Sequence, residues 1–181
     1  EPFVGEWQVL PIGLSKEFIA QAATEYHYIT EENILPLLRK RSKFSHKGTY
    51  GHALIIAGSK GKMGAAVMAA KSALRAGAGL VTAHIPNCGY SVLQSSAPEA
   101  MCETDENETH ISGRLNTGNY NAVAIGPGIG NDDATARALK LLIQETTVNP
   151  LFDADALNII SENKTWLPFM RGGSILTLHP K

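Results

Sequence analysis

The sequence lacks a charge excess and a long apolar run, and each absence excludes a class of protein. Its 181 residues carry a formal net charge of -1, which gives no electrostatic reason to expect binding to nucleic acid or to an anionic membrane surface. No apolar run approaches the roughly 20 residues of a membrane-spanning helix. We therefore expect no nucleic-acid partner and no membrane insertion.

Cysteine is also scarce, and histidine is scattered. Cys88 and Cys102 are the two cysteines of the chain, and their spacing matches no metal-binding pattern. The six histidines form no H-x-x-x-H pair, so the sequence predicts no side-chain metal site. Two reduced thiols are typical of a cytoplasmic protein, which is the location we expect.

A regular alternation of apolar strands and helices fills the chain from residue 52 onward. Strands are predicted in "HALIIAG", "LVTAHI", "YNAVAIG", "NPLFDADAL" and "GSILTLHP", and the clearest helices in "AAVMAAKSALRAGA" and "NDDATARALKLLIQET". Strands that are apolar on both faces indicate a parallel sheet covered by helices on both sides. The predicted fold class is α/β.

The remaining segments have weaker patterns. Residues 6–14 alternate apolar and polar side chains and predict a short strand. Residues 15–26 are compatible with one short helix or a linker, and Pro36 limits residues 29–41 to a short or kinked helix. Residues 102–113 are polar and acidic, and they predict a solvated loop.

Two glycine-rich turns follow predicted strands and precede predicted helices. The first, "GSKGKMGAA", contains Gly58, Gly61 and Gly64, a spacing that matches neither the dinucleotide fingerprint nor the P-loop. Spacing alone is equally compatible with a packing turn and with an anion site. The second turn, residues 124–130, reads "AIGPGIG". Because both turns end parallel strands, they line the same edge of the sheet, where open α/β sheets bind ligands.

Acidic and histidine side chains are predicted at this edge too. Asp153 and Asp155 end an apolar strand, and His179 ends the last one. If the strand runs through both acids, its period of two places them on one face. If it ends between them they diverge, and we expect only one to reach a ligand. A capping role remains open for either acid alone.

Taken in order, the motifs "HKGTYGHALIIAGSKGKMGAA", "ALRAGAGLV", "PEAM", "VAIGPGIG", "DADALN" and "ILTLHP" resemble those of the ADP/ATP-dependent NAD(P)H-hydrate dehydratases. The resemblance implies a ribokinase-like three-layer parallel sheet. It also implies repair of hydrated NADH or NADPH at the expense of ADP or ATP, with Mg²⁺ accompanying the nucleotide. A homo-oligomer is expected by the same resemblance.

The resemblance carries substrate contacts over to particular residues. Ala65, Gly128 and His179 match the contact positions of the family most directly, and Asp155 is expected to face the site. Lys47 and Gly48 of "HKGTYG" match a family motif at the site, although a surface lysine before a strand is the simpler reading. Gly64 of "MGAA" completes the predicted set.

The chain departs from the family pattern in its last residues and in what it does not contain. Leu178 replaces the usual proline, Lys181 stands where glycine is expected, and no K-G-x-x-T or G-x-G-D motif occurs. The catalytic Asp of the G-x-G-D motif is therefore unassigned, and we expect a truncated fold that is inactive in this reaction by itself. An uncovered apolar strand edge should also make the isolated 181 residues unstable.

The first residues, "GEWQVLPIGLSKEFI", resemble the end of the epimerase domain that many bacteria fuse ahead of the dehydratase. We therefore predict an epimerase tail and linker over residues 1–26, and the first part of the dehydratase over residues 27–181. Two alternatives remain: a small-molecule kinase of the same fold, and a non-catalytic dinucleotide-binding module.

Overall fold

The computed structural model describes residues 5–6, 8–38 and 40–179, and the chain divides into two compact units, residues 1–43 and 44–181. The first unit contains α1 (Lys16–Gln21), α2 (Glu31–Ile34) and the 3-10 turn η1 (Leu35–Leu37). Pro36 lies in η1, so the predicted limit on this helix is confirmed. None of the residues described in this unit is buried.

The strand predicted over residues 6–14 is wrong: the described part of this segment has no strand. An alternating pattern predicts that one face of a strand is buried, but a strand also needs a neighbouring strand for its backbone hydrogen bonds. The residues described there have exposed side chains, including Val9 and Ile12, so they also lack the buried face that the pattern implied.

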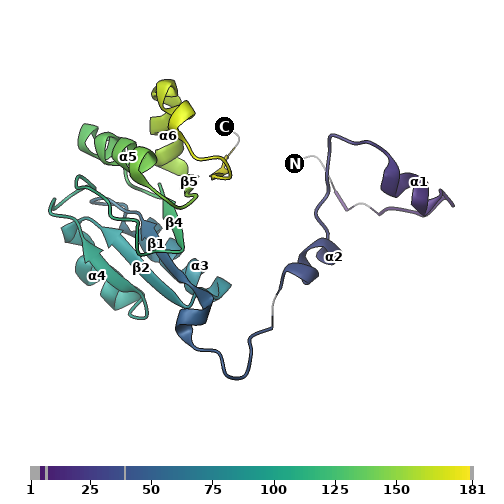
Figure 1. Cartoon of the computed structure of the whole chain (residues 1–181), viewed down its shortest axis with the longest axis horizontal. Coiled ribbons are helices and arrows are strands. Elements are labelled where there is room, and N and C mark those ends of the chain that lie inside the picture. Colours follow the sequence, from purple (N-terminus) through teal and green to yellow (C-terminus); the bar gives the residue numbers. More distant parts are fainter. Residues whose placement is uncertain (1–4, 7, 39, 180–181) are drawn as a thin grey trace. The chain divides into compact units, whose positions relative to one another are not determined.

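The second unit is built on a parallel sheet of six strands in the order β3-β2-β1-β4-β5-β6 (Figure 1). Each described pair of neighbours is parallel, so the predicted α/β class is confirmed. The elements are η2 (Lys47–Tyr50), β1 (His52–Ile56), α3 (Met63–Ala76), β2 (Leu80–Ile85), η3 (Asn87–Gly89), α4 (Tyr90–Ser96), β3 (Met101–Thr104), β4 (Ala122–Ile125), α5 (Asp133–Glu145), β5 (Leu151–Asp153), α6 (Ala154–Glu162), η4 (Lys164–Phe169) and β6 (Ile175–Thr177).

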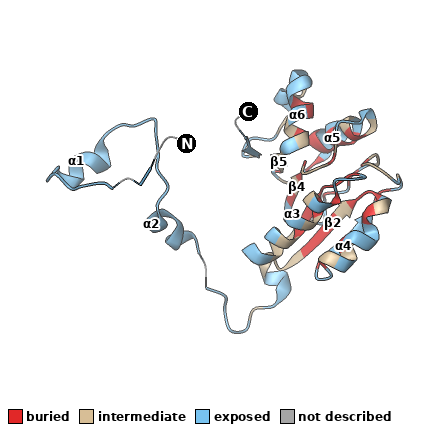
Figure 2. Cartoon of the chain, turned by 180° about the vertical axis from the view of Figure 1, so that it is seen from behind, coloured by how far each residue is buried: buried red, intermediate tan, exposed pale blue. Residues whose placement is uncertain are grey.

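The core lies on both faces of the sheet, and β1 contributes to both. Leu54 and Ile56 pack in the cluster that contains the buried side chains of α5 and α6, whereas Ile55 packs with those of α3 and α4. Buried residues accordingly follow the strands and the inner sides of these helices (Figure 2). Alternate β1 side chains point to opposite faces, so the buried part of this central strand, residues 54–56, has to be apolar on both faces.

The loop predicted over residues 102–113 is wrong in its first part. Met101–Thr104 forms β3, which pairs with β2, and Asp105 behind it is buried. The rest of the segment continues as an irregular crossover to β4. No helix among the residues described is long and apolar enough to cross a membrane.

Candidate functional site

The first glycine turn follows β1 and leads into α3. Gly58 and Gly61 have φ of +86° and +84°, a backbone conformation that side chains other than glycine rarely adopt. A Cβ at Gly58 would lie 2.8 Å from the Met63 sulfur and 3.2 Å from the Ala66 Cβ. Glycine at this position therefore lets the turn lie directly against the start of α3.

The second glycine turn follows β4 and is fastened to the first. Gly58 N–H donates to the Pro127 carbonyl oxygen at 2.8 Å, and the Ser59 hydroxyl donates to the Gly128 carbonyl oxygen at 2.7 Å. A Cβ at Gly128 would lie 2.9 Å from the Ala65 Cβ. The structure thus brings the predicted residues Ala65 and Gly128 into contact.

The third part of the site is the turn between β5 and α6. β5 ends at Asp153, so the strand stops between the two acids and their side chains diverge. Asp153 accepts a hydrogen bond at 2.7 Å from the hydroxyl of Thr177, which lies on β6. Asp155 instead accepts from Gly130 N–H at 2.8 Å, which joins it to the second glycine turn. Ala154 between them has φ of 45°, a strained conformation for a residue with a side chain.

Lys62 is a residue of this site that the sequence reasoning missed. Its ammonium lies 3.4 Å from the Asp155 Oδ2, and the pair is partly exposed. Lys62 immediately precedes α3, whereas Asp155 lies in the first turn of α6. The sequence shows Lys62 as a lysine inside a glycine turn, but its partner Asp155 lies 93 positions away, so the turn alone does not identify the pair.

Two cavities adjoin these turns. One, of about 420 Å³, is lined by Lys62, Gly130, Asp155 and part of α6. The other, of about 500 Å³, is lined by Asp153, Thr177 and His179. Both include residues Asn158 and Ser161 of α6, so the cavity at His179 neighbours the one at Asp155.

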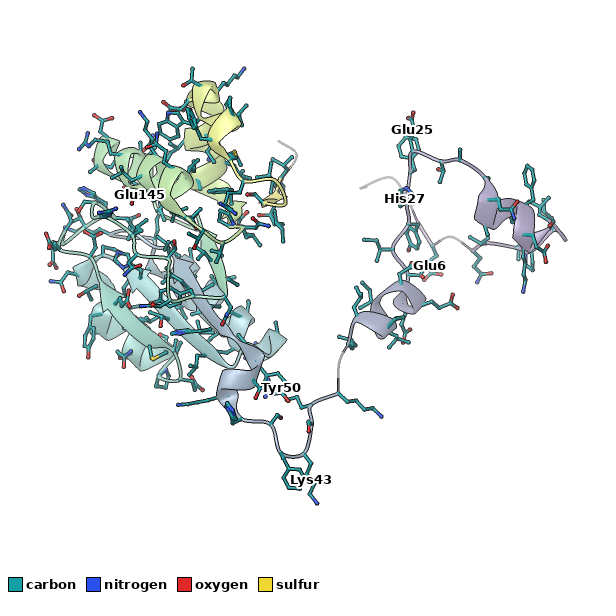
Figure 3. All side chains as sticks on the ribbon, viewed as in Figure 1. Glu6, Glu25, His27, Lys43, Tyr50 and Glu145 are labelled. Atoms are coloured by element: carbon teal, nitrogen blue, oxygen red, sulfur yellow. The ribbon has the colours of Figure 1, made fainter. Side chains whose placement is uncertain are left out.

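The remaining predicted residues divide into one near this site and two away from it. Gly64 is exposed in the first turn of α3, beside Ala65. Lys47 and Gly48 form part of η2, which ends at Tyr50, labelled in Figure 3, before β1 begins. They therefore lie at the amino end of β1, opposite the glycine turns. The structure does not bring Lys47 and Gly48 to this site. Pro180 and Lys181 lie outside the described residues.

A buried carboxylate lies in the segment that follows β3. Asp105 follows β3, and its side chain is fully buried. Burial by itself would raise the pKa of this carboxyl, but hydrogen bonds from Ser112, Asn107 and Gly113 lower its pKa well below the ordinary range. Asp105 is therefore ionised near neutral pH and accepts these bonds as a carboxylate.

A second perturbed group lies on the same side of the sheet, farther from the turns. The Tyr120 hydroxyl donates to Glu103 Oε1 at 2.8 Å, and burial together with this neighbour raises the pKa of Tyr120 to about 12. Among the residues described, no group of three or more His, Cys, Asp or Glu side chains could hold a metal ion. The arrangement is suited to binding a ligand by backbone groups and a few side chains, rather than to holding a metal by protein ligands.

Known proteins are similar to this chain in sequence. The chain is 37% identical to the bifunctional NAD(P)H-hydrate repair enzyme Nnr of Coxiella burnetii, over 98% of this chain and 35% of that protein. It is 36% identical to the ADP-dependent (S)-NAD(P)H-hydrate dehydratase of Staphylococcus aureus, over 85% of this chain and 55% of that protein. The chain thus spans between about a third and somewhat over half of the length of these relatives.

A solved structure is similar as well. The ADP/ATP-dependent NAD(P)H-hydrate dehydratase of Bacillus subtilis, co-crystallised with ATP and Mg²⁺, has 29% sequence identity and a TM-score of 0.60, over 75% of this chain and 48% of that one. A ribokinase-like superfamily protein of Enterococcus faecalis shares the fold with a TM-score of 0.64. The predicted ribokinase-like fold is therefore confirmed. The sequence model for NAD(P)H-hydrate dehydratases matches residues 53–181. The chain belongs to the NAD(P)H-hydrate dehydratase family.

Proposed function

We propose that the protein takes part in the repair of hydrated NADH and NADPH, and that the described residues form the side of the enzyme that binds the hydrated dinucleotide. The single observation that carries this proposal is the joining of three strand-to-helix turns at one sheet edge. Gly58 is hydrogen-bonded to Pro127, and Gly130 to Asp155. A parallel sheet binds ligands at this edge, and the relatives are by name an NAD(P)H-hydrate repair enzyme and an NAD(P)H-hydrate dehydratase.

The site residues that we propose act by positioning. Ala65, Gly64 and Gly128 would bring backbone close to the dinucleotide, and Gly64, where a Cβ would meet nothing within 4 Å, leaves room for that approach. Asp155 and His179 would contact its polar groups from two neighbouring cavities. We give Lys47 and Gly48 no role in binding the dinucleotide, because they lie at the other end of β1.

ADP or ATP, when bound with Mg²⁺, supplies the phosphoryl group that turns the ring hydroxyl into a good leaving group. The described residues hold no cluster of acids for the metal, so in this proposal Mg²⁺ arrives with the nucleotide. No described residue is assigned as the base, and the proposal for this chain is limited to binding and orienting the dinucleotide.

The proposal also covers the N-terminal residues of the chain. The Coxiella and Moorella bifunctional enzymes align with 98% and 97% of this chain, whereas the Listeria and Staphylococcus dehydratases align with 75% and 85%. This difference supports residues 1–26 as an epimerase tail and linker, ahead of a dehydratase part over 27–181. We also propose a homo-oligomer in the cytoplasm, with a dinucleotide and no nucleic acid as its ligand.

The test is a repair assay with hydrated NADH and ADP, in which the recovery of NADH absorbance is followed. It is run on the 181-residue chain and on the protein at its natural full length. Recovery by the natural protein supports the proposal. Binding of hydrated NADH by the 181-residue chain supports the part of the proposal that assigns dinucleotide binding to this chain. No recovery by either, with phosphoryl transfer to a small alcohol instead, would overturn it in favour of a kinase.

A further inference from the structure

The segment after β3 is folded around one carboxylate. Asp105 accepts hydrogen bonds from Ser112 N–H at 2.9 Å, the Ser112 hydroxyl at 2.7 Å, Gly113 N–H at 3.1 Å and Asn107 N–H at 2.9 Å. His84 on β2 lies 3.3 Å from the same side chain. Residues 105–113, called here the Asp105 loop, therefore close on themselves with the carboxylate at the centre.

The Asp105 loop is also fastened to the rest of the sheet edge. Asn107 accepts from Thr109 N–H at 2.9 Å with its side-chain oxygen, and from Asn87 N–H at 3.0 Å with its carbonyl oxygen. On the other side, the Thr135 hydroxyl of α5 donates to the Ile111 carbonyl oxygen at 2.8 Å. The loop is therefore held between the turn after β2 and the start of α5.

The same loop reaches the first glycine turn. Lys60 N–H donates to the Thr109 carbonyl oxygen at 2.8 Å. Lys60 lies between Gly58 and Gly61, both with positive φ. Because glycine has more backbone freedom than any other residue, hydrogen bonds from outside such a turn have a large part in setting its conformation.

We propose that Asp105 is a positioning residue, which acts through the Asp105 loop and Lys60 to hold the first glycine turn in the conformation that binds the dinucleotide. This inference rests on the proposed function for its substrate, but not for the structural link. The carboxylate itself is buried; it accepts from Asn107 N–H, the Asn107 side chain accepts from Thr109 N–H, and the Thr109 carbonyl accepts from Lys60 N–H. Side-chain burial and four donated hydrogen bonds make Asp105 suited to this role.

The first measurement is amide hydrogen exchange over residues 58–64, in the protein at its natural full length. Two variants loosen the loop: Asp105→Asn removes the charged acceptor, and Asn107→Ala is a milder change at a half-buried side chain. Leu142→Ala in α5 is the matched control, because it opens the core and lies two turns from Thr135. We expect exchange in residues 58–64 to rise about tenfold in both loop variants but not in the control.

The second measurement separates positioning from simple loss of stability. The kinetics of both loop variants are measured at a temperature well below the melting transition of each protein. We expect their KM for hydrated NADH to rise about fivefold, while kcat and the KM for the nucleotide change little. Exchange that is unchanged, or raised equally by Leu142→Ala, would overturn the inference, as would an equal rise in both KM values. If the unsubstituted protein repairs no hydrated NADH, the proposed function fails, while the exchange comparison still decides the structural link.

Discussion

Gly128 is a site position where a single methyl group should be costly. Its φ is +69°, and an added Cβ would meet the Ala65 Cβ at 2.9 Å and the Lys62 carbonyl oxygen at 3.1 Å. We expect Gly128→Ala to lower the free energy of unfolding by about 1 kcal/mol through the backbone conformation and by about 1–3 kcal/mol more through overpacking. Urea unfolding measures the stability, and the KM for hydrated NADH should rise with it.

Gly61→Ala is the matched control for this substitution. Gly61 has φ of +84°, but a Cβ there would meet nothing within 4 Å. It should therefore lose about 1 kcal/mol from the backbone conformation alone. Equal losses at both positions would contradict the close packing of Gly128 on the start of α3.

Asp105 gives the fold a pH dependence with a definite sign. Its pKa is lowered in the folded state, so the unfolded chain takes up the proton first, and the stabilisation is lost as the pH falls below about 4, the ordinary pKa of an aspartate. We expect Asp105→Asn to lower the free energy of unfolding by about 2 kcal/mol at pH 7, and this difference to shrink in acid. Urea unfolding between pH 7 and about pH 3 measures it.

Glu145→Gln removes the same charge from a more exposed carboxylate, on α5 (Figure 3), which is paired with Arg114. An exposed ion pair contributes about 0–1 kcal/mol, so this variant should follow the unsubstituted protein across the same pH range. A difference between Asp105 and Asn at position 105 that does not change with pH would show that the carboxylate does not stabilise the fold through its charge.

Two helices start at the site, and one ion pair links them. Lys62 precedes α3, Asp155 lies in the first turn of α6, and 3.4 Å separates their charged atoms. Asp155→Asn keeps an oxygen for Gly130 N–H but loses the ion pair, so we expect a stability change below about 1 kcal/mol. The affinity for hydrated NADH, measured by calorimetry, should fall about tenfold if this carboxylate contacts the ligand.

The control for this pair is Asp133→Asn, which removes an exposed carboxylate from the first turn of α5. It makes the same change in charge at another helix start. If both variants lower the affinity equally, the effect comes from the overall charge of the sheet edge, and Asp155 loses its assigned role.

The elements of this site differ in how far the sequence could predict them. The two glycine turns were predictable because an apolar strand, glycines and an apolar helix follow one another locally, and the buried faces of β1 follow from "HALIIAG". β3 was not predictable, since it is a four-residue edge strand with mostly exposed side chains. Its place in the sheet depends on pairing with β2, which no local pattern encodes.

Single side chains of the site show the same limit. Asp105 stands among several acids in the sequence, and only the return of Ser112 and Gly113 to it distinguishes it from a solvated residue. Likewise, Asp155 and Lys62 are far apart in the chain. Partners of this kind depend on tertiary contacts, so the residue types could be predicted as site candidates, but their pairing could not.

The described sheet has two edge strands, β3 and β6, and β6 exposes several apolar side chains. This edge strand is exposed along its length, with Ile175 58%, Leu176 46% and Leu178 75% exposed at or just after it. An exposed apolar edge strand presents unpaired backbone groups and apolar side chains to any other chain. We expect the 181 residues, when produced alone, to self-associate through this edge.

Light scattering after gel filtration measures this association across a range of concentrations. The double substitution Ile175→Thr with Leu176→Thr keeps residues that favour strands but removes apolar surface, so it should shift the chain towards the monomer. Met68→Lys is the matched control, because Met68 is 72% exposed but lies on α3, away from β6. A monomer that melts cooperatively at every concentration, unchanged by the β6 substitutions, would show that this edge needs no cover, and the sheet would then be stable with β6 as its last strand.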